Sequence, residues 1–252
     1  MKYLSTLVLL VTLCYAKDED ESFLPEYIHP CTLADEEFEK CVRKQIVESL
    51  PHFANGIPEM SVPSIDPVDL NDIIIDGSGL KLKFSDAKMH GLSKLKLADF
   101  KIQLGVDNES FILAVKGNLS LTAQYNADGR ILILPLKGEG DALIDCRNIE
   151  VNISSLLEHV KGKDGKEHLK LLTPNYEYEI ESTTFDLKNL FNGNKQLAET
   201  TLKFANENWR QLMDDLAPPA VKQIVKTIVK AINKFLSKVT IPRIVIGYKE
   251  RL

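Results

Sequence analysis

The chain has 252 residues, of which 44% are hydrophobic and 27% are charged, a composition typical of a globular protein. Its formal net charge of −5 at pH 7 argues against nucleic-acid binding, because that binding depends on a basic surface that neutralises phosphates. A chain of this length can hold one large β-containing domain or two small ones.

The first residues, MKYLSTLVLLVTLCYA, have the pattern of a secretory signal peptide. One lysine precedes an apolar run from Leu7 to Leu13, and the small residues Cys14 and Ala16 stand at the usual cleavage spacing. The run is too short to span a bilayer, and no later stretch has the length of a membrane span. We therefore expect a signal peptide at 1–16, no transmembrane segment, and a secreted, extracellular product consisting of one domain at 17–252.

Three cysteines remain once Cys14 is removed with the signal peptide. Cys31 and Cys41 bracket the stretch CTLADEEFEKC, and a disulfide bond between them is expected in a secreted protein. The alternative, a metal-binding pair, lacks further ligands at a suitable spacing, so we expect neither a metal nor a cofactor. Cys146 is then a free thiol, which fits a buried apolar residue better than a nucleophile.

Three asparagines begin the pattern Asn-X-Ser, which is the acceptor for N-glycosylation on the secretory route. The glycosylation candidates are Asn108, Asn118 and Asn152.

The first predicted element along the chain is a helix. Apolar residues from Glu36 to Leu50 follow an amphipathic pattern, which predicts a helix that ends before Pro51. The next stretch, GIPEMSVPSIDPVDL, contains Pro58, Pro63 and Pro67, which favour an extended connector over a regular strand.

The periodicity then changes to two, which predicts β-strands. In GLKLKF the residues Leu80, Leu82 and Phe84 share one face and the lysines share the other. Further strands are predicted in KLKLADFKIQL, FILAVKG, NLSLTAQY, RILILPL, DALIDCRNIEVNIS, HLKLL, YEYEI and TFDL. Turns are predicted at GVDNES, at NADGR with its Asp128-Gly129 pair, at KGEG and at GKDGKE. This pattern predicts an antiparallel meander with one apolar face.

Two helices are predicted near the C-terminus and can cover that face. The first runs from about Asn194 to Leu216, and Pro218 and Pro219 then break or kink the chain. The second is VKQIVKTIVKAINKFLSKV, at 221–239, with a lysine at every fourth position and apolar residues on the opposite side. Two interpretations are open: a helix packed on its own sheet, or a helix that lies on a membrane surface.

The sequence contains no recognisable catalytic motif. DGSGL lacks the spacing of a nucleophile elbow and is interpreted as a turn. GEGDAL precedes a strand and lacks the third glycine of a dinucleotide site. The histidines are scattered, without metal-ligand spacing. The protein is therefore not expected to be an enzyme.

Three stretches of the chain carry a family resemblance: LPEYIHPCTLADEEFEKCVRKQI, ANGIPEMSVPSIDPVDL and LFNGNKQLAETTLKFANENWRQLMDDLAPPAVKQIV. Together they resemble the insect Takeout and haemolymph juvenile-hormone-binding protein family, and the similarity covers essentially the whole mature chain. The family's N-terminal disulfide carries over to Cys31 and Cys41. Cys146 has no second partner, which favours the Takeout-like branch. The ending TIPRIVIGYKERL departs from the family pattern and is a candidate for an additional strand.

The resemblance implies an α+β fold of the tubular lipid-binding superfamily, in which a long C-terminal helix is wrapped by a highly curved antiparallel β-sheet that encloses a hydrophobic tunnel. It also implies a monomeric carrier of one elongated hydrophobic ligand, such as a juvenile-hormone-like terpenoid, fatty acid, pigment or odorant. The alternatives are a surface-active protein that docks on membranes or lipid particles through the lysine-striped helix, and an interaction protein with a collapsed tunnel that contacts a receptor.

Apolar and aromatic side chains of the predicted strands and helices are the candidates for lining the tunnel. The candidate ligand-binding residues are Leu82, Phe84, Phe100, Ile102, Tyr125, Ile133, Tyr178, Phe204, Trp209, Ile224, Ile228 and Phe235.

Overall fold

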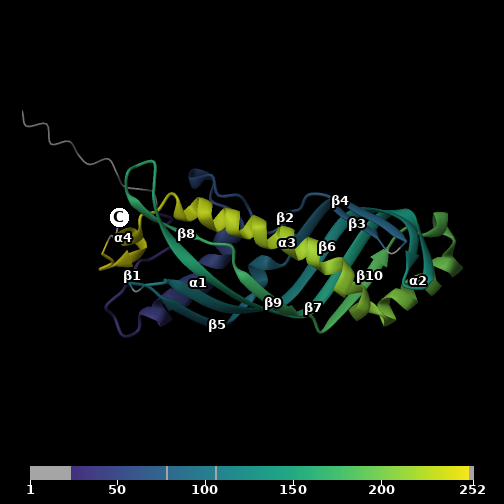
Figure 1. Cartoon of the computed structure of the whole chain (residues 1–252), viewed down its shortest axis with the longest axis horizontal. Coiled ribbons are helices and arrows are strands. Elements are labelled where there is room, and N and C mark those ends of the chain that lie inside the picture. Colours follow the sequence, from purple (N-terminus) through teal and green to yellow (C-terminus); the bar gives the residue numbers. More distant parts are fainter. Residues whose placement is uncertain (1–23, 78, 106, 250–252) are drawn as a thin grey trace, which may run out of the picture.

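A computed structural model describes residues 24–77, 79–105 and 107–249. The fold is α+β, as predicted: a curled antiparallel sheet forms a half-barrel, and a long helix lies lengthwise against it (Figure 1). The predicted signal peptide lies outside the described residues, and the division of the chain at residue 16 stays a prediction.

Two long central strands organise the sheet, β6 (Ser110–Ile131) and β7 (Leu134–Lys161). Along its other edge, β7 pairs in succession with three short strands, and β6 pairs with β4 and β5. β2 and β3 both pair with β4. The remaining large-sheet strands are β2 Val68–Asp69, β3 Ile73–Gly77, β4 Leu80–His90, β5 Lys96–Gln103, β8 Glu167–Leu171, β9 Asn175–Glu179 and β10 Ser182–Leu187.

Four α-helices and three short 3-10 turns accompany the sheet. Their bounds are α1 Phe38–Ala54, α2 Lys195–Glu207, α3 Trp209–Leu236 and α4 Ile241–Ile244, with the 3-10 turns at Pro58–Met60, Leu92–Lys94 and Phe191–Gly193. α3 packs against β3, β8 and β10, which lie at the rims of the curled sheet. α2 lies at one end of the molecule, and α1 and α4 lie at the other (Figure 1).

The alternation predicted for β4 is confirmed. Leu80, Leu82 and Phe84 are buried, while Lys81 and Lys83 are exposed. A bulge between Leu97 and Asp99 also explains why the apolar positions of the next strand change from odd to even numbers.

The turn predicted at Asp128-Gly129 is wrong. β6 continues to Ile131, and the reversal occurs at Leu132 and Ile133. The break predicted at KGEG is also wrong, because β7 runs through it. A Cβ at Gly138 would lie 2.8 Å from the Tyr125 hydroxyl oxygen and 3.0 Å from Leu190 Cα, so this glycine permits close packing and does not mark a turn.

The predicted helix boundaries are corrected at three prolines. α1 continues past Pro51 to Ala54, and Pro51 lies on the exposed side, where water can satisfy the carbonyl that loses its partner. α3 likewise runs through Pro218 and Pro219. The break between the two late helices instead falls at Asn208, whose side-chain amide donates to the Phe204 carbonyl at 2.8 Å.

Two asparagine side chains fasten the late helices to the rims of the sheet. The Phe185 N–H of β10 donates to Asn206 Oδ1 at 2.7 Å, and Asn206 Nδ2 donates to the Phe185 carbonyl at 3.1 Å. Asn233 of α3 makes the same pair of bonds to Leu171 of β8, at 2.7 Å and 2.9 Å. Each asparagine satisfies a backbone donor and acceptor on the outer side of a short edge strand.

The predicted disulfide bond between Cys31 and Cys41 is present, and it ties β1 (Cys31–Thr32) to α1. β1 also pairs in parallel with β11 (Val245–Ile246), so the prediction of an additional C-terminal strand is confirmed.

Cys146 is free and buried, facing Thr183, whose hydroxyl lies 3.7 Å from the sulfur. Burial raises the pKa of its thiol, which favours the unreactive protonated form. The thiol therefore has the properties of a packed apolar group and lacks those of an activated nucleophile.

Candidate ligand-binding site

Burial of the sheet's inner face changes along its length. Where β7 pairs with β10, the inward residues Ala142, Ile144 and Cys146 are buried. Where β7 pairs with β9, the inward residues Val151 and Ile153 are only partly buried. One end of the half-barrel is therefore a filled core, and the other end exposes part of its apolar lining.

The accessible lining continues onto the neighbouring strands. Cross-strand partners point to the same face, so the register assigns this inner face to residues on β5, β6 and β9 as well. Its partly buried members on the strands are Leu97, Ile102, Phe111, Leu113, Val115, Val151, Ile153, Tyr176 and Tyr178.

α3 adds a matching apolar stripe. At 100° per residue, Val221, Val225, Val229 and Ile232 lie on one side of a buried line that contains Ile224 and Ala231. The four stripe residues are partly buried, in contrast to that line. Partly accessible apolar residues on both the helix and the inner face indicate incomplete packing between them.

A pocket of about 530 Å³ lies where β7 and β9 meet the first turns of α3, within the range typical of small-molecule sites. Tyr178 and Trp209, both predicted as ligand-binding residues, come together here. The pocket is lined by Asn148, Glu150, Tyr178, Glu179, Ile180, Glu181, Trp209, Arg210, Met213 and Asp214. It combines an aromatic and aliphatic floor with a polar rim.

The rim carries an excess of negative charge. Glu150, Glu179, Glu181 and Asp214 face one cation of the pocket lining, Arg210, whose guanidinium carbon lies 4.6 Å from the centre of the Trp209 ring. Glu150 also forms an ion pair with Lys116 outside the pocket, at 2.7 Å. Burial, and then the neighbouring Tyr176 and Asp214, raise the pKa of Tyr178, so its hydroxyl stays a proton donor near neutral pH.

The other predicted residues divide into three groups. Leu82, Phe84, Phe100, Tyr125 and Ile224 are buried, most of them in the filled core, and Ile102, Phe204, Ile228 and Phe235 are partly buried. Phe235 packs edge-on against Phe53 of α1, with ring centres 5.9 Å apart. Ile133 is a correction: it lies in the β6–β7 turn and is 77% exposed, because the chain reverses there and not at Asp128-Gly129.

Tyr125 has a structural role. Its hydroxyl donates to the Lys188 carbonyl at 2.6 Å, and burial, followed by the nearby Glu139, raises its pKa from 10.0 to about 12. The folded state therefore favours the protonated phenol, which is a stabilising contribution that is complete below pH 10 and lost as the pH rises through 12. We expect the stability difference between wild type and Tyr125→Phe to shrink over this interval, as measured by urea unfolding. A difference that is constant with pH would contradict this assignment.

A polar cluster that sequence reasoning missed lies near the C-terminus. His159 Nε2 is 3.0 Å from Glu109 Oε2, its Nδ1 contacts Glu167, and the Tyr248 hydroxyl donates to Glu109 Oε1 at 2.7 Å. These residues come from three distant parts of the chain, since only His159 and Glu167 are near one another in sequence, so no local motif could reveal the cluster. The cluster anchors the segment after β11 to the half-barrel.

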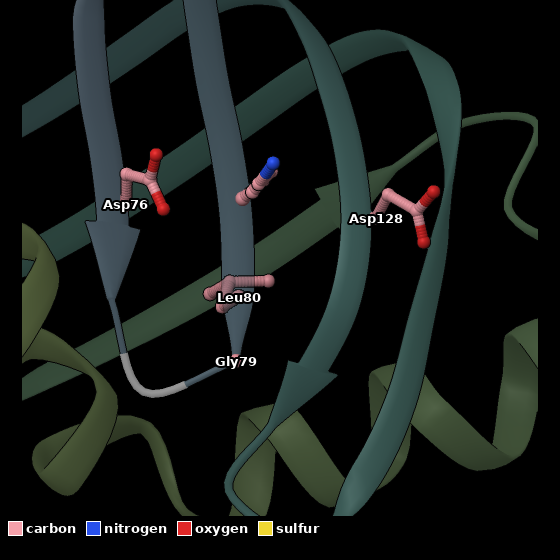
Figure 2. A pocket seen from close by; sticks show the side chains of 5 residues that line it. Asp76, Gly79, Leu80 and Asp128 are labelled. Carbon is pink, nitrogen blue, oxygen red and sulfur yellow. The ribbon is translucent and has the colours of Figure 1, made fainter.

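A second pocket, of about 300 Å³, lies at the β3–β4 hairpin. Asp76, Gly79, Leu80, Lys81 and Asp128 line it, and Figure 2 shows the two carboxylates on separate strands. This mostly charged lining does not suit a lipophilic molecule.

Metal-binding clusters of three or more His, Cys, Asp or Glu residues do not occur in the described part of the chain. Within the same ranges, no helix has the length and apolar character needed to cross a membrane.

A curled antiparallel half-barrel with a long helix along it, and partly buried apolar residues on both, is the architecture of a family of carriers of hydrophobic ligands. The chain belongs to the haemolymph juvenile hormone binding protein family, whose model matches residues 7–246. It is 33% identical over 211 residues to the circadian clock-controlled protein daywake of Drosophila melanogaster, with 80% of each chain covered.

Two further similarities concern Takeout and a pigment-associated protein. The crystal structure of Epiphyas postvittana Takeout 1 superposes with a TM-score of 0.79 and 31% identity, covering 87% of this chain and 100% of that one. A Schistocerca gregaria protein named "Putative beta-carotene-binding protein" is 24% identical over 208 residues, covering 82% of this chain and 78% of its own length. The predicted family and its Takeout-like character are therefore confirmed.

Proposed function

We propose that this protein is a secreted, monomeric carrier that holds one elongated lipophilic molecule in an apolar channel between α3 and the inner face of the sheet, without catalysis. The main supporting observation is the row of partly accessible apolar residues that continues from the α3 stripe to β5, β6, β7 and β9. The names of the family and of the Schistocerca gregaria relative, which refer to lipophilic molecules, support the same function.

The pocket at Tyr178 and Trp209 is the proposed mouth of the channel. A ligand that buries about ten methylene groups gains about 8 kcal/mol before association costs are subtracted. Apolar burial alone therefore leaves modest affinity, and the polar rim of the pocket is placed to contact the ligand's polar end.

The charge of that rim suggests which polar end is accepted. Four carboxylates and one guanidinium disfavour a ligand with its own carboxylate, because like charges would be brought together in a partly desolvated pocket. Among the ligand classes expected from the sequence, neutral terpenoids, pigments and odorants therefore fit better than free fatty acids. The direct comparison is the affinity for a fatty alcohol against the fatty acid of the same chain length, with the alcohol expected to bind more tightly.

Native mass spectrometry of the purified protein, followed by organic extraction of what it releases, tests the carrier function. We expect one lipophilic molecule per chain. An empty protein that also fails to take up terpenoids, fatty alcohols and fatty acids would exclude the carrier function.

Replacing Trp209 by alanine tests the position of the mouth. The substitution removes the indole from the pocket floor and is expected to weaken binding of a fluorescent lipophile at least tenfold, because loss of a buried aromatic contact costs at least about 1.4 kcal/mol. Ile133→Ala is the matched control, since Ile133 lies in an exposed turn, and its affinity should equal that of wild type. Equal affinities for all three proteins would move the binding site away from this pocket.

A further inference from the structure

A row of lysines follows the outer side of α3. Lys222, Lys226, Lys230 and Lys234 recur at every fourth residue, and Lys238 follows just beyond the end of the helix. All except Lys234, which is partly buried, are exposed. Sixteen residues separate the first and last lysine, which corresponds to a row about 24 Å long at helical rise.

Several lysines of the sheet are paired, in contrast. Lys83 pairs with Asp72 at 2.7 Å, Lys116 with Glu150 at 2.7 Å and Lys170 with Glu158 at 2.9 Å. Among the described residues, none of the five lysines in the α3 row forms an ion pair of this kind. Five lysines without such a partner therefore follow one another along a single helix of a chain whose formal net charge is −5.

The position of α3 connects this row to the proposed channel. The helix is fastened to β8 by the two hydrogen bonds between Asn233 and Leu171, so the side of the helix that carries the lysines has a fixed orientation. The stripe of Val221, Val225, Val229 and Ile232 runs alongside the row on the same helix. A surface that binds the lysines would consequently lie close to the helix that lines the channel.

We propose that the lysine row of α3 docks the folded protein on anionic lipid bilayers. Successive lysines turn by about 40° around the helix axis, and their flexible side chains can bring several of them to the phosphate-bearing headgroups that a bilayer presents in a plane. Docking through this row does not require the apolar face of α3 to leave the sheet. The proposed docking does not depend on which ligand is carried. A role of this docking in loading or releasing the ligand rests on the proposed carrier function.

The expected strength of membrane binding follows from the number of lysines in the row. Each lysine near an anionic membrane contributes about 1 kcal/mol, which corresponds to about a fivefold change in affinity. Replacing Lys222, Lys226 and Lys230 by glutamine should therefore weaken binding by about 100-fold. Salt should weaken the binding of the wild type as well, because the lysines are exposed to solvent.

Co-sedimentation with vesicles tests the docking. The full mature chain is mixed with phosphatidylcholine vesicles that contain or lack phosphatidylserine, at low and at physiological salt. We expect binding only to the vesicles with phosphatidylserine, and loss of that binding in the α3 triple variant. The matched control is the variant with Lys83, Lys116 and Lys170 replaced by glutamine, which has the same net charge and should bind within a few-fold of wild type.

Three results would overturn the proposal: no binding of wild type to anionic vesicles, equal loss in both triple variants, or equal affinity for a soluble polyanion such as heparin. Circular dichroism verifies that both triple variants are folded. Uptake of a fluorescent lipophile without vesicles is measured in the same proteins. It should be unchanged, so a failure of membrane docking can be distinguished from a failure of the carrier function.

Discussion

Replacing both Cys31 and Cys41 by serine is expected to lower the free energy of unfolding by about 3 kcal/mol, because the open chain gains loop entropy in the unfolded state. The bond spans ten residues and joins β1 to α1. β1 in turn pairs with β11, so the loss should also loosen the C-terminal segment. Urea unfolding followed by circular dichroism measures the change.

Cys146→Ala is the control for this experiment. It removes a buried thiol that takes part in no disulfide, and its cost should be about 1 kcal/mol. A double variant no less stable than Cys146→Ala would show that the bridge contributes little to stability.

Asn206→Ala is expected to lower the free energy of unfolding by about 2 to 4 kcal/mol. The asparagine bonds both the N–H and the carbonyl of Phe185, and Phe185 is buried. Its removal leaves a backbone donor and acceptor without these partners, each costing about 1 to 3 kcal/mol if water cannot replace the bond. Thermal and urea unfolding of the variant measure the loss.

Asn126→Ala controls for the loss of an asparagine as such. The Asn126 side chain lies on the surface, where its amide donates to Glu139 at 3.2 Å, so its removal should change stability by less than about 0.5 kcal/mol. If Asn206→Ala were as mild as Asn126→Ala, solvent would have to replace both bonds at β10, and α2 would not depend on this contact.

Features that depend on neighbouring residues were predicted well. The alternation of Leu80, Leu82 and Phe84 identified the buried face of β4, and the short separation of Cys31 and Cys41 identified the disulfide bond. The amphipathic pattern likewise predicted the lysine-striped helix, which packs against β3, β8 and β10 in the structure. In each of these cases the physical cause acts within a few residues of chain.

The candidate site was predicted only in part, because its residues meet through the tertiary structure. Tyr178 and Trp209 were both selected as aromatic candidates, but their meeting in one pocket depends on where α3 begins beside β9. Ile133 was assigned to the interior because the reversal of the chain was placed at Asp128-Gly129. The carboxylates of the rim come from two strands, the connection after β9 and a helix, so no single motif reveals their common location.

The amino-acid sequence alone was sufficient to indicate the antiparallel strands, the disulfide bond and the lysine-striped helix, because periodicity and residue spacing are local properties. The family resemblance of three stretches implied the curvature of the sheet. The tertiary structure decided that Gly138 allows Tyr125 to pack closely, that Pro218 continues a helix, and that Asn206 and Asn233 bond the backbone of distant strands. These outcomes depend on groups far away in the chain. The same residue types would favour turns and helix ends if only their neighbours acted on them.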